Sequence, residues 1–337
     1  MTQVLQHTAP VEASAIQSCT LEVRDLCTYY KTRAGIAKAV DGVSFTVSPG
    51  RILGLVGESG SGKSATGFSL MGLVDPPGAI VSGSVTFEGE DITHWPEKQM
   101  RRLRGDRMAM IFQDPMMTLN PVLRIGTQMV ETLLAHRKMS RNEAIRRSAE
   151  ALAMVGIPAA HERLSAYPHE FSGGMRQRVA IAIALLLSPS LIIADEPTTA
   201  LDVTIQAQIL SEVQKLARAK NMAVIWISHD LSVVSALADD IAVMYAGRIV
   251  EQGPVHRVLS QPAHPYTRGL LSSVASNNEP GLRLKQIRGA PSRLLDLPAG
   301  CAFEPRCDYA TQRCKAAPDT TYLDTEHQVR CFHPLKY

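Results

Sequence analysis

The sequence predicts an α/β protein in which a parallel sheet is flanked by helices, with a helical insertion and a small Cys-rich C-terminal extension. Short apolar runs alternate with helical segments, a pattern typical of parallel sheets. One of these runs leads directly into GxxxxGK[ST] at Gly57–Ser64, a motif that requires a strand before it and a helix after it. Four cysteines crowd into residues 301–337, which indicates an appendage behind the main fold.

Length and composition are those of a globular protein with a core. The chain has 337 residues, enough for two domains or one large domain with an appendage. The net charge is only +3, which argues against nucleic-acid binding. No Lys or Arg precedes Arg24, so a signal peptide is not expected. Because no apolar run reaches the ~18 residues needed to span a bilayer, we expect another chain to carry any membrane role.

Composition along the chain predicts four parts. The chain before about residue 276 has balanced charge and the periodic patterns of strands and helices, whereas residues 276–300 are rich in Gly, Pro, Ser and Asn. The expected parts are a mobile N-terminal tail at 1–19, a main domain at 20–275 with its helical insertion at about 114–172, a linker at 276–300, and a Cys-rich extension at 301–337.

The individual elements follow from local patterns. Leu21–Leu26 and Val43–Val47 alternate as strands, and the apolar run Ile52–Val56 suits a buried parallel strand. The segment Lys63–Leu73 predicts a helix. Ser140-Arg-Asn-Glu143 matches a capping box, so a helix of the insertion is expected to begin there and to end before Pro158.

Predicted strands and helices continue to alternate towards the C-terminus. Leu191–Ala194 and Ala223–Ile227 are predicted strands, with a helix between them that Asp202 can cap. Ile241–Glu251 is predicted to form a hairpin around Ala246-Gly247.

The phosphate-loop motif predicts a nucleotide site. Its glycines let backbone N–H groups turn towards phosphate oxygens, and the following helix presents its positive end. Lys63 is expected to reach the β- and γ-phosphates, and the Ser64 hydroxyl to ligate Mg²⁺. The ATP-binding residues of the loop are Gly57, Glu58, Ser59, Gly60, Ser61, Gly62, Lys63 and Ser64.

An apolar strand that ends in Asp195-Glu196 supplies the second half of the site. Asp195 is expected beside Mg²⁺, and Glu196 is expected to polarise the attacking water. Many strands end in acidic residues, so this pattern is specific only together with the phosphate loop. His229, after the next strand, is a candidate γ-phosphate sensor, and Gln113 a candidate ligand of Mg²⁺ or water. An ordinary surface histidine and an ordinary loop glutamine are the alternatives.

The segment Phe171-Ser172-Gly173-Gly174-Met175-Arg176-Gln177 comes between these motifs. In their order, from phosphate loop through Gln113, this signature, Asp195-Glu196 and Ala200-Leu201-Asp202 to His229, the motifs resemble the nucleotide-binding subunit of ABC transporters over roughly residues 20–275. The resemblance implies a P-loop ABC ATPase core with an antiparallel β subdomain.

The resemblance also implies a head-to-tail dimer with two ATP molecules at its interface. Ser172, Gly173, Gly174 and Met175 would then contact ATP bound to the partner's phosphate loop, and Asp202 would lie in the D-loop. Met175 departs from the usual LSGGQ signature and removes an amide side chain. Tyr30 matches the aromatic that stacks on adenine in the family; Tyr29 is the fallback, and two ordinary strand-edge aromatics are the alternative.

His264-Pro265-Tyr266-Thr267, followed by Leu270-Leu271, resembles the C-terminal extension of dipeptide and oligopeptide importer ATPases, and the cysteine tail resembles that of the dipeptide-permease D-type subunit. This implies an ATP-hydrolysing subunit on the cytoplasmic face of the bacterial inner membrane. Its partners would be a second homologous ATPase, two transmembrane permeases and, indirectly, a peptide-binding protein, with no nucleic acid. An importer of nickel or another small solute, and a DNA-repair or ribosome-associated ABC ATPase, are the alternatives.

The cysteine spacing at Cys301, Cys307, Cys314 and Cys331 lacks the CxxC pairs of common zinc sites. Four thiolates on irregular loops can hold a [4Fe–4S] cluster, and the resemblance points the same way. Zinc, free thiols and disulfides stay open. The extension at residues 301–337 has few large apolar residues. So small a core rarely stabilises a segment of this length, so a structural metal centre is expected. Its separation in sequence from Lys63 and Glu196 gives no reason to connect it with hydrolysis.

Overall fold

The computed structural model describes residues 19–199, 201–273 and 286–336. Nearly all of the expected N-terminal tail, the first part of the expected linker and Ala200 lie outside the described residues. Within the described chain, the strands form one four-stranded and one eight-stranded sheet. The predicted class, α/β, is confirmed.

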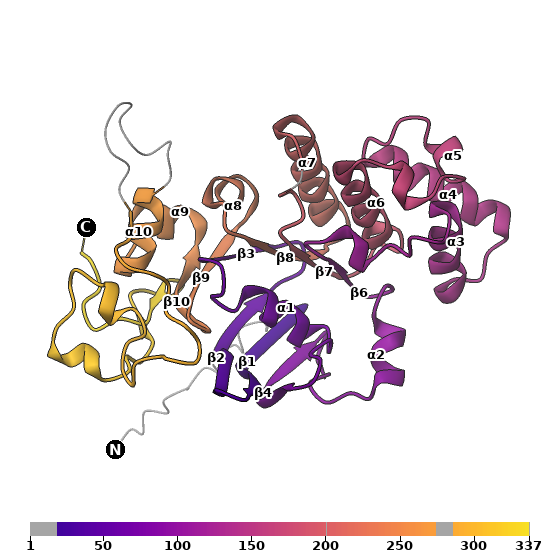
Figure 1. The fold of residues 1–337 in the computed structure, drawn as a ribbon. Coiled ribbons are helices and arrows are strands. Elements are labelled where there is room, and N and C mark those ends of the chain that lie inside the picture. Colours follow the sequence, from indigo (N-terminus) through magenta and orange to yellow (C-terminus); the bar gives the residue numbers. More distant parts are fainter. Residues whose placement is uncertain (1–18, 200, 274–285, 337) are drawn as a thin grey trace, which may run out of the picture.

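The eight-stranded sheet is the centre of the molecule (Figure 1). Its strand order is β11-β12-β10-β9-β3-β8-β7-β6, and the five strands β9, β3, β8, β7 and β6 run parallel to one another, whereas β10 is antiparallel to β9. The strands are β3 (Ile52–Val56), β6 (Met108–Ile111), β7 (Leu191–Asp195), β8 (Ala223–Ser228), β9 (Asp240–Tyr245), β10 (Arg248–Pro254), β11 (Thr321–Tyr322) and β12 (Gln328–Val329).

The second sheet is antiparallel, in the order β2-β1-β4-β5, and confirms the expected antiparallel subdomain. It covers one face of the central sheet, with α1 between the two (Figure 1). Its strands are β1 (Leu21–Thr32), β2 (Gly35–Val47), β4 (Gly78–Phe87) and β5 (Glu90–Asp91).

Helices complete the layers, and α6, α7 and α8 cover the opposite face of the central sheet (Figure 1). The helices are α1 (Lys63–Leu70), α2 (Glu97–Leu103), α3 (Ile125–His136), α4 (Arg141–Met154), α5 (Ala160–Arg163), α6 (Gly173–Leu185), α7 (Val203–Lys220), α8 (Leu231–Leu237), α9 (Val255–Ser260) and α10 (Pro265–Ser273). The helix predicted to reach Leu73 ends three residues earlier because Gly72 adopts φ +61°, a left-handed conformation that ends helices.

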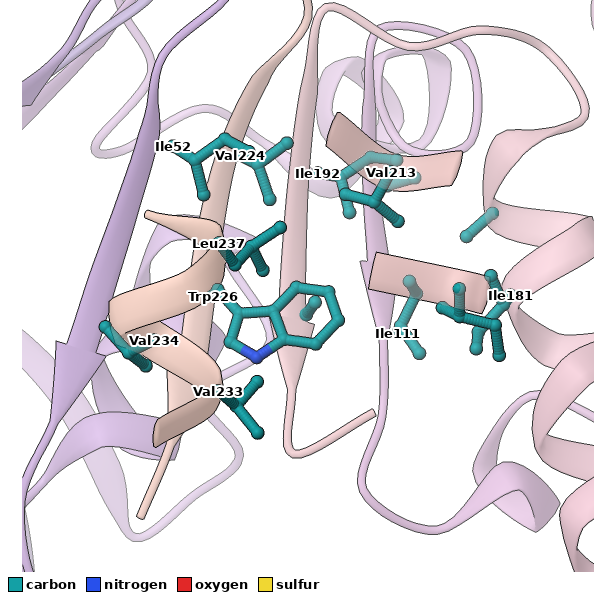
Figure 2. Packing of buried hydrophobic residues seen from close by; sticks show 14 of the residues in the cluster. Ile52, Ile111, Ile181, Ile192, Val213, Val224, Trp226, Val233, Val234 and Leu237 are labelled. Atoms are coloured by element: carbon teal, nitrogen blue, oxygen red, sulfur yellow. The ribbon is translucent and has the colours of Figure 1, made fainter. Parts of the chain in front are cut away.

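Alternating residues of the central strands build two cores. On β8, Val224 and Trp226 join the cluster with α6, α7 and α8, whereas Ile225 and Ile227 join the cluster with the antiparallel sheet. Figure 2 shows the Trp226 ring beside Val233 and Leu237 of α8. Because both faces of the parallel strands are buried, their ends are held rigidly where polar loops follow.

Helix α4 of the helical insertion begins as its capping pattern predicts. The Ser140 hydroxyl accepts a hydrogen bond from the Glu143 N–H at the start of α4. Leu119, before α3, is 2% exposed and belongs to the core. Met117, two residues earlier, is 61% exposed. These two apolar residues therefore have opposite environments.

The C-terminal extension packs directly on the main domain (Figure 1). Strand β12 pairs with β10 and so continues the central sheet. Phe303 is buried in the main core, and Val329 is buried on β12. The buried Glu251 carboxylate of β10 accepts hydrogen bonds from the Ala263 and His264 N–H groups and contacts His327 Nε2 at 2.8 Å. The extension therefore shares the core of the main domain, which supports it in addition to the metal centre that its sparse apolar content predicts.

Candidate functional site

The phosphate loop lies between β3 and α1, as its motif requires. Gly62 precedes the helix with φ +105°, and a Cβ there would lie 2.1 Å from the Ala39 carbonyl oxygen, so a larger residue is excluded. At Gly60 a Cβ would meet nothing within 4 Å. The loop thus packs tightly on its outer side and leaves space at Gly60, where a phosphate group can approach backbone N–H groups.

Lys63 is held inside the loop. Its side chain is buried, and its ammonium donates hydrogen bonds to the carbonyl oxygens of Gly57 (2.8 Å) and Glu58 (3.0 Å). Burial lowers the pKa of Lys63, while Glu196, Asp195 and Glu58 oppose this shift through their charges. The ammonium is therefore ordered before a nucleotide binds, which reduces the entropy that phosphate binding costs.

Asp195 ends β7 and is 3% exposed. Its Oδ1 atom is buried without a hydrogen-bond partner among the described residues. Burial raises the pKa of Asp195, and an interaction with the Ser64 side chain opposes the increase. A buried, unpartnered carboxylate oxygen beside a hydroxyl matches the hard-oxygen donor set that Mg²⁺ prefers, so the predicted metal ligands fit the ion.

The three predicted catalytic residues meet at Glu196. Its carboxylate receives a hydrogen bond from the Gln113 amide at 3.4 Å and lies 3.1 Å from His229 Nδ1. Glu196 has φ +46°, an uncommon conformation for a residue with a side chain, and such strain recurs at functional sites. The Thr199 hydroxyl, which the sequence analysis does not single out, donates to the same carboxylate at 3.3 Å.

The signature segment opens α6. The Ser172 hydroxyl accepts a hydrogen bond from the Met175 N–H (3.3 Å), so Ser172 is the helix N-cap. Ser172 and Gly173 are exposed, and a Cβ at Gly173 would meet nothing within 4 Å. The start of α6 is therefore accessible to another molecule, as a role in trans requires. Gln177 further along the helix donates to the Phe112 carbonyl oxygen, a contact that the motif does not predict.

The remaining nucleotide-site candidates, Tyr29, Tyr30 and Asp202, differ in the contacts that their side chains make. Tyr29 donates a hydrogen bond from its hydroxyl to Asp41 (2.6 Å), and burial together with this bond raises its pKa. Tyr30 pairs with Gly78 across β1 and β4 and is partly exposed. Unlike Tyr29, it is not tied to Asp41 by a hydrogen bond from its hydroxyl. Asp202 accepts a hydrogen bond from the Ile205 N–H (2.9 Å) and caps α7 as predicted.

The four C-terminal cysteines share one small cavity. Cys301, Cys307, Cys314 and Cys331 line it together with His264 and Phe303, among others. Burial raises the pKa of Cys307 to about 12 and that of Cys331 to about 11. All six cysteines of the chain, each of them described, are free. In the described ranges, no group of three or more His, Cys, Asp or Glu side chains is arranged to hold a metal ion.

The extension also reaches the phosphate loop. Arg306 binds both carboxylate oxygens of Glu58, at 2.6 and 3.0 Å. The Glu58 N–H donates to the Tyr266 hydroxyl at 2.8 Å. The sequence separation does not predict this contact between Arg306 and Glu58. Only the position of Arg306 next to Cys307 could have drawn attention to it.

Comparison with known proteins agrees with these features. The ABC transporter family model matches residues 40–199, and the model described as oligopeptide/dipeptide transporter, C-terminal region, matches residues 250–314. The oligopeptide transport ATP-binding protein OppD of Salmonella typhimurium is 49% identical over 316 residues, 94% of each chain. AppD of Bacillus subtilis, also an oligopeptide transport ATP-binding protein, is 47% identical over 317 residues, 94% of this chain and 97% of that one.

Solved structures share the fold. The dimeric structure of the bacterial ABC transporter cassette MJ0796 matches with a TM-score of 0.64 at 26% identity, covering 70% of this chain and 98% of that one. The cbiO1 protein of Clostridium perfringens matches with a TM-score of 0.59, covering 72% and 91%. In the described part of the chain, none of the helices combines the length and the apolar character needed to cross a membrane.

Proposed function

Because this chain belongs to the ABC transporter family, among the ATP-binding proteins of oligopeptide transport, we propose that it hydrolyses ATP to energise the import of di- and oligopeptides across the bacterial cytoplasmic membrane. The observation that carries the chemistry is the meeting of Gln113 and His229 at the Glu196 carboxylate, next to the phosphate loop. The identity to OppD over nearly the whole chain supports the peptide assignment.

Binding of ATP is assigned to the phosphate loop and the surrounding side chains. Lys63 exchanges its hydrogen bonds to the Gly57 and Glu58 carbonyls for phosphate oxygens. Ser64, Asp195 and Gln113 would hold Mg²⁺, which neutralises phosphate charge when bound. Tyr30, rather than the hydrogen-bonded Tyr29, is the better candidate to stack on adenine.

Hydrolysis is assigned to Glu196. Its carboxylate orients the attacking water and accepts a proton from it, and Gln113 fixes one carboxylate oxygen. His229 is assigned to the γ-phosphate.

Completion of the site is assigned to a second ATPase subunit. The exposed start of α6 would place the N–H groups near Ser172 and Gly174 against a γ-phosphate on the partner, where a helix N-terminus favours negative charge. The Met175 side chain has no amide group to offer that nucleotide. The two composite sites of a heterodimer with a homologous ATPase would therefore be unequal. Asp202 at the D-loop would lie at the same interface.

The assembly would include two transmembrane permeases, with a peptide-binding protein acting through them. The chain would then sit peripherally on the cytoplasmic face of the inner membrane. The segment from Gln113 to about Ser165 is assigned to permease contact, with the exposed Met117 as its apolar element. The similarity to the oligopeptide transport proteins OppD and AppD favours peptide import over a nickel importer and over repair or ribosome functions.

We assign a [4Fe–4S] cluster to Cys301, Cys307, Cys314 and Cys331, and its role is structural. The four thiols line one cavity, and a bound cluster stabilises the thiolates whose formation burial disfavours. Zinc binding requires four ligands close around a single ion, and the described side chains are not so arranged.

Reconstitution tests the proposed function. The chain is assembled with the permeases and the second ATPase of its own transporter, in proteoliposomes containing ATP. Labelled di-, tri- and longer peptides should accumulate with ATP hydrolysis, and Ni²⁺ should not. Uptake of Ni²⁺ alone, or hydrolysis that no peptide stimulates, would contradict the peptide assignment.

A further inference from the structure

Arg306 is a buried arginine whose two terminal nitrogens bind the Glu58 carboxylate. The side chain is 4% exposed, and the Glu58 side chain is 23% exposed. Two parallel hydrogen bonds between a guanidinium and a carboxylate fix orientation as well as distance. The contact connects the C-terminal extension with the second residue of the phosphate loop.

Contacts outside the phosphate loop also hold this arginine in place. Arg306 Nε donates to the Arg288 carbonyl oxygen at 3.0 Å. The arginine closes a 3-10 turn at Glu304–Arg306, directly after Phe303. The Phe303 ring packs against Tyr245 and Tyr266, with ring centroids 5.3 and 5.4 Å apart. The guanidinium is therefore ordered by a packed aromatic cluster.

Glu58 is held from a second direction by the same cluster. Its N–H donates to the hydroxyl of Tyr266, a fully buried residue of α10. Both the backbone and the side chain of Glu58 are thus fixed by residues that follow the main nucleotide-binding motifs in sequence. The loop conformation beside Lys63 depends on them, because the Glu58 carbonyl oxygen accepts a hydrogen bond from the Lys63 ammonium.

The charge of Glu58 explains why a cation is needed there. A carboxylate in the phosphate loop repels the triphosphate and attracts the Lys63 ammonium, with which it interacts electrostatically. Arg306 neutralises it at contact distance. Removing one partner of a buried ion pair leaves the other charge uncompensated and costs more than removing both.

We propose that Arg306 is a positioning residue for ATP binding, through which the C-terminal extension completes the phosphate loop by orienting and neutralising Glu58. This inference rests on the proposed function, because it concerns the same nucleotide site. Since Cys307 follows Arg306 directly, the cysteine cavity and the phosphate loop are joined by a single backbone step. The extension then contributes to nucleotide affinity as well as to folding.

The test is a double-mutant cycle on MgATP affinity, measured by calorimetry on the purified full chain. Arg306→Met should weaken binding about tenfold or more, since it leaves the Glu58 carboxylate unpaired. Adding Glu58→Gln to Arg306→Met should recover most of the loss. Arg313→Met, at an exposed arginine that packs on the Phe332 ring of the same extension, is the matched control and should bind like the wild type.

The possible outcomes distinguish a failure of this inference from a failure of the proposed function. If Arg306→Met binds MgATP like the wild type, or if the double variant is as weak as Arg306→Met, the inference is wrong. If the wild type itself binds no ATP, the proposed function fails instead. Near-ultraviolet circular dichroism checks folding. Should Arg306→Met not fold, Arg306→Lys keeps the charge without the two-pronged geometry, and the inference then requires a smaller loss of MgATP affinity, whereas wild-type affinity would contradict it.

Discussion

The Gln177 side chain donates a hydrogen bond to the Phe112 carbonyl oxygen at 3.3 Å. Gln177 is 1% exposed and lies on α6, the helix that begins at the signature. Phe112 directly precedes Gln113, whose amide contacts Glu196. The signature helix and the catalytic carboxylate are thereby connected through two side chains and one peptide unit.

Gln177→Leu tests this connection. The change removes the hydrogen bond and places an apolar side chain of similar size in the same buried position. We expect ATP affinity to stay near that of the wild type, since Lys63 is untouched. Peptide-stimulated hydrolysis in the assembled transporter should fall by a factor of about 5 to 10, as expected for one hydrogen bond of about 1 kcal/mol. Unchanged stimulated turnover would show that the contact transmits nothing.

Glu196→Gln should separate binding from hydrolysis. The amide keeps the size of the side chain and loses the proton acceptor, so turnover should fall by ~10²–10⁴. Nucleotide affinity should persist because the phosphate loop is unchanged. Single-turnover hydrolysis and equilibrium ATP binding in the assembled complex measure the two effects. Near-normal turnover would rule out Glu196 as the general base.

Cys307→Ser should lower iron content and stability together. Anaerobically purified wild-type protein is expected to be brown with about four irons per chain. The variant should lose iron and unfold at a lower temperature, and its ATP affinity should also fall because Arg306 precedes Cys307. Cys19→Ser, at a cysteine outside the cavity, is the control. Colourless wild-type protein with one zinc per chain would replace the cluster by a zinc site.

His264 should make the folded state sensitive to acid. Burial lowers its pKa from 6.5 to about 3, and its Nδ1 accepts a hydrogen bond from the Tyr266 N–H, so it is neutral when folded. The unfolded chain binds a proton at this residue below pH 6.5, so stability falls as the pH drops from 6.5 towards 3. Between pH 7.5 and 5.0 the loss from this group is about 2 kcal/mol.

Urea titrations at the two pH values measure that loss. His264→Asn keeps an acceptor near the position of Nδ1 and removes the titration, so its pH dependence should be smaller than that of the wild type. His94→Asn, at an exposed histidine, should leave the pH dependence unchanged. Equal slopes for wild type and His264→Asn would mean that other groups cause the acid sensitivity.

Met117 should lie at the permease interface. It is exposed in the loop after Gln113, whereas the neighbouring Leu119 is buried and unavailable. Met117→Cys carrying a photocrosslinker should attach to a permease in the assembled transporter. The same label at Val203, an exposed apolar position at the start of α7, provides a comparison. Crosslinks from residue 117 that reach only ATPase chains would exclude this docking surface.

Much of the candidate site is predictable because its determinants are local. The phosphate loop depends on glycines within a few residues of Lys63. Helix caps at Ser140, Ser172 and Asp202 depend on a hydrogen bond to an N–H three residues later. Such contacts need no knowledge of the rest of the chain, so a motif suffices to predict them.

The sequence could not predict contacts that depend on strand order. Glu196, Gln113 and His229 follow β7, β6 and β8, so their meeting requires these strands to be neighbours in one parallel sheet. The family resemblance anticipated that arrangement, whereas the spacing of the residues does not determine it. For the same reason the sequence does not distinguish Met117, which is exposed, from Leu119, which is buried.

The sequence by itself determined the nucleotide motifs, the α/β class and the helix starts, because each rests on interactions between residues close in the chain. Only the tertiary structure placed Arg306 on Glu58, which lies 248 residues away in sequence. That contact exists because β12 extends the central sheet and Phe303 enters the core beside Tyr266. Long-range burial of apolar surface fixes where a charged group ends up, and no local pattern around Arg306 encodes it.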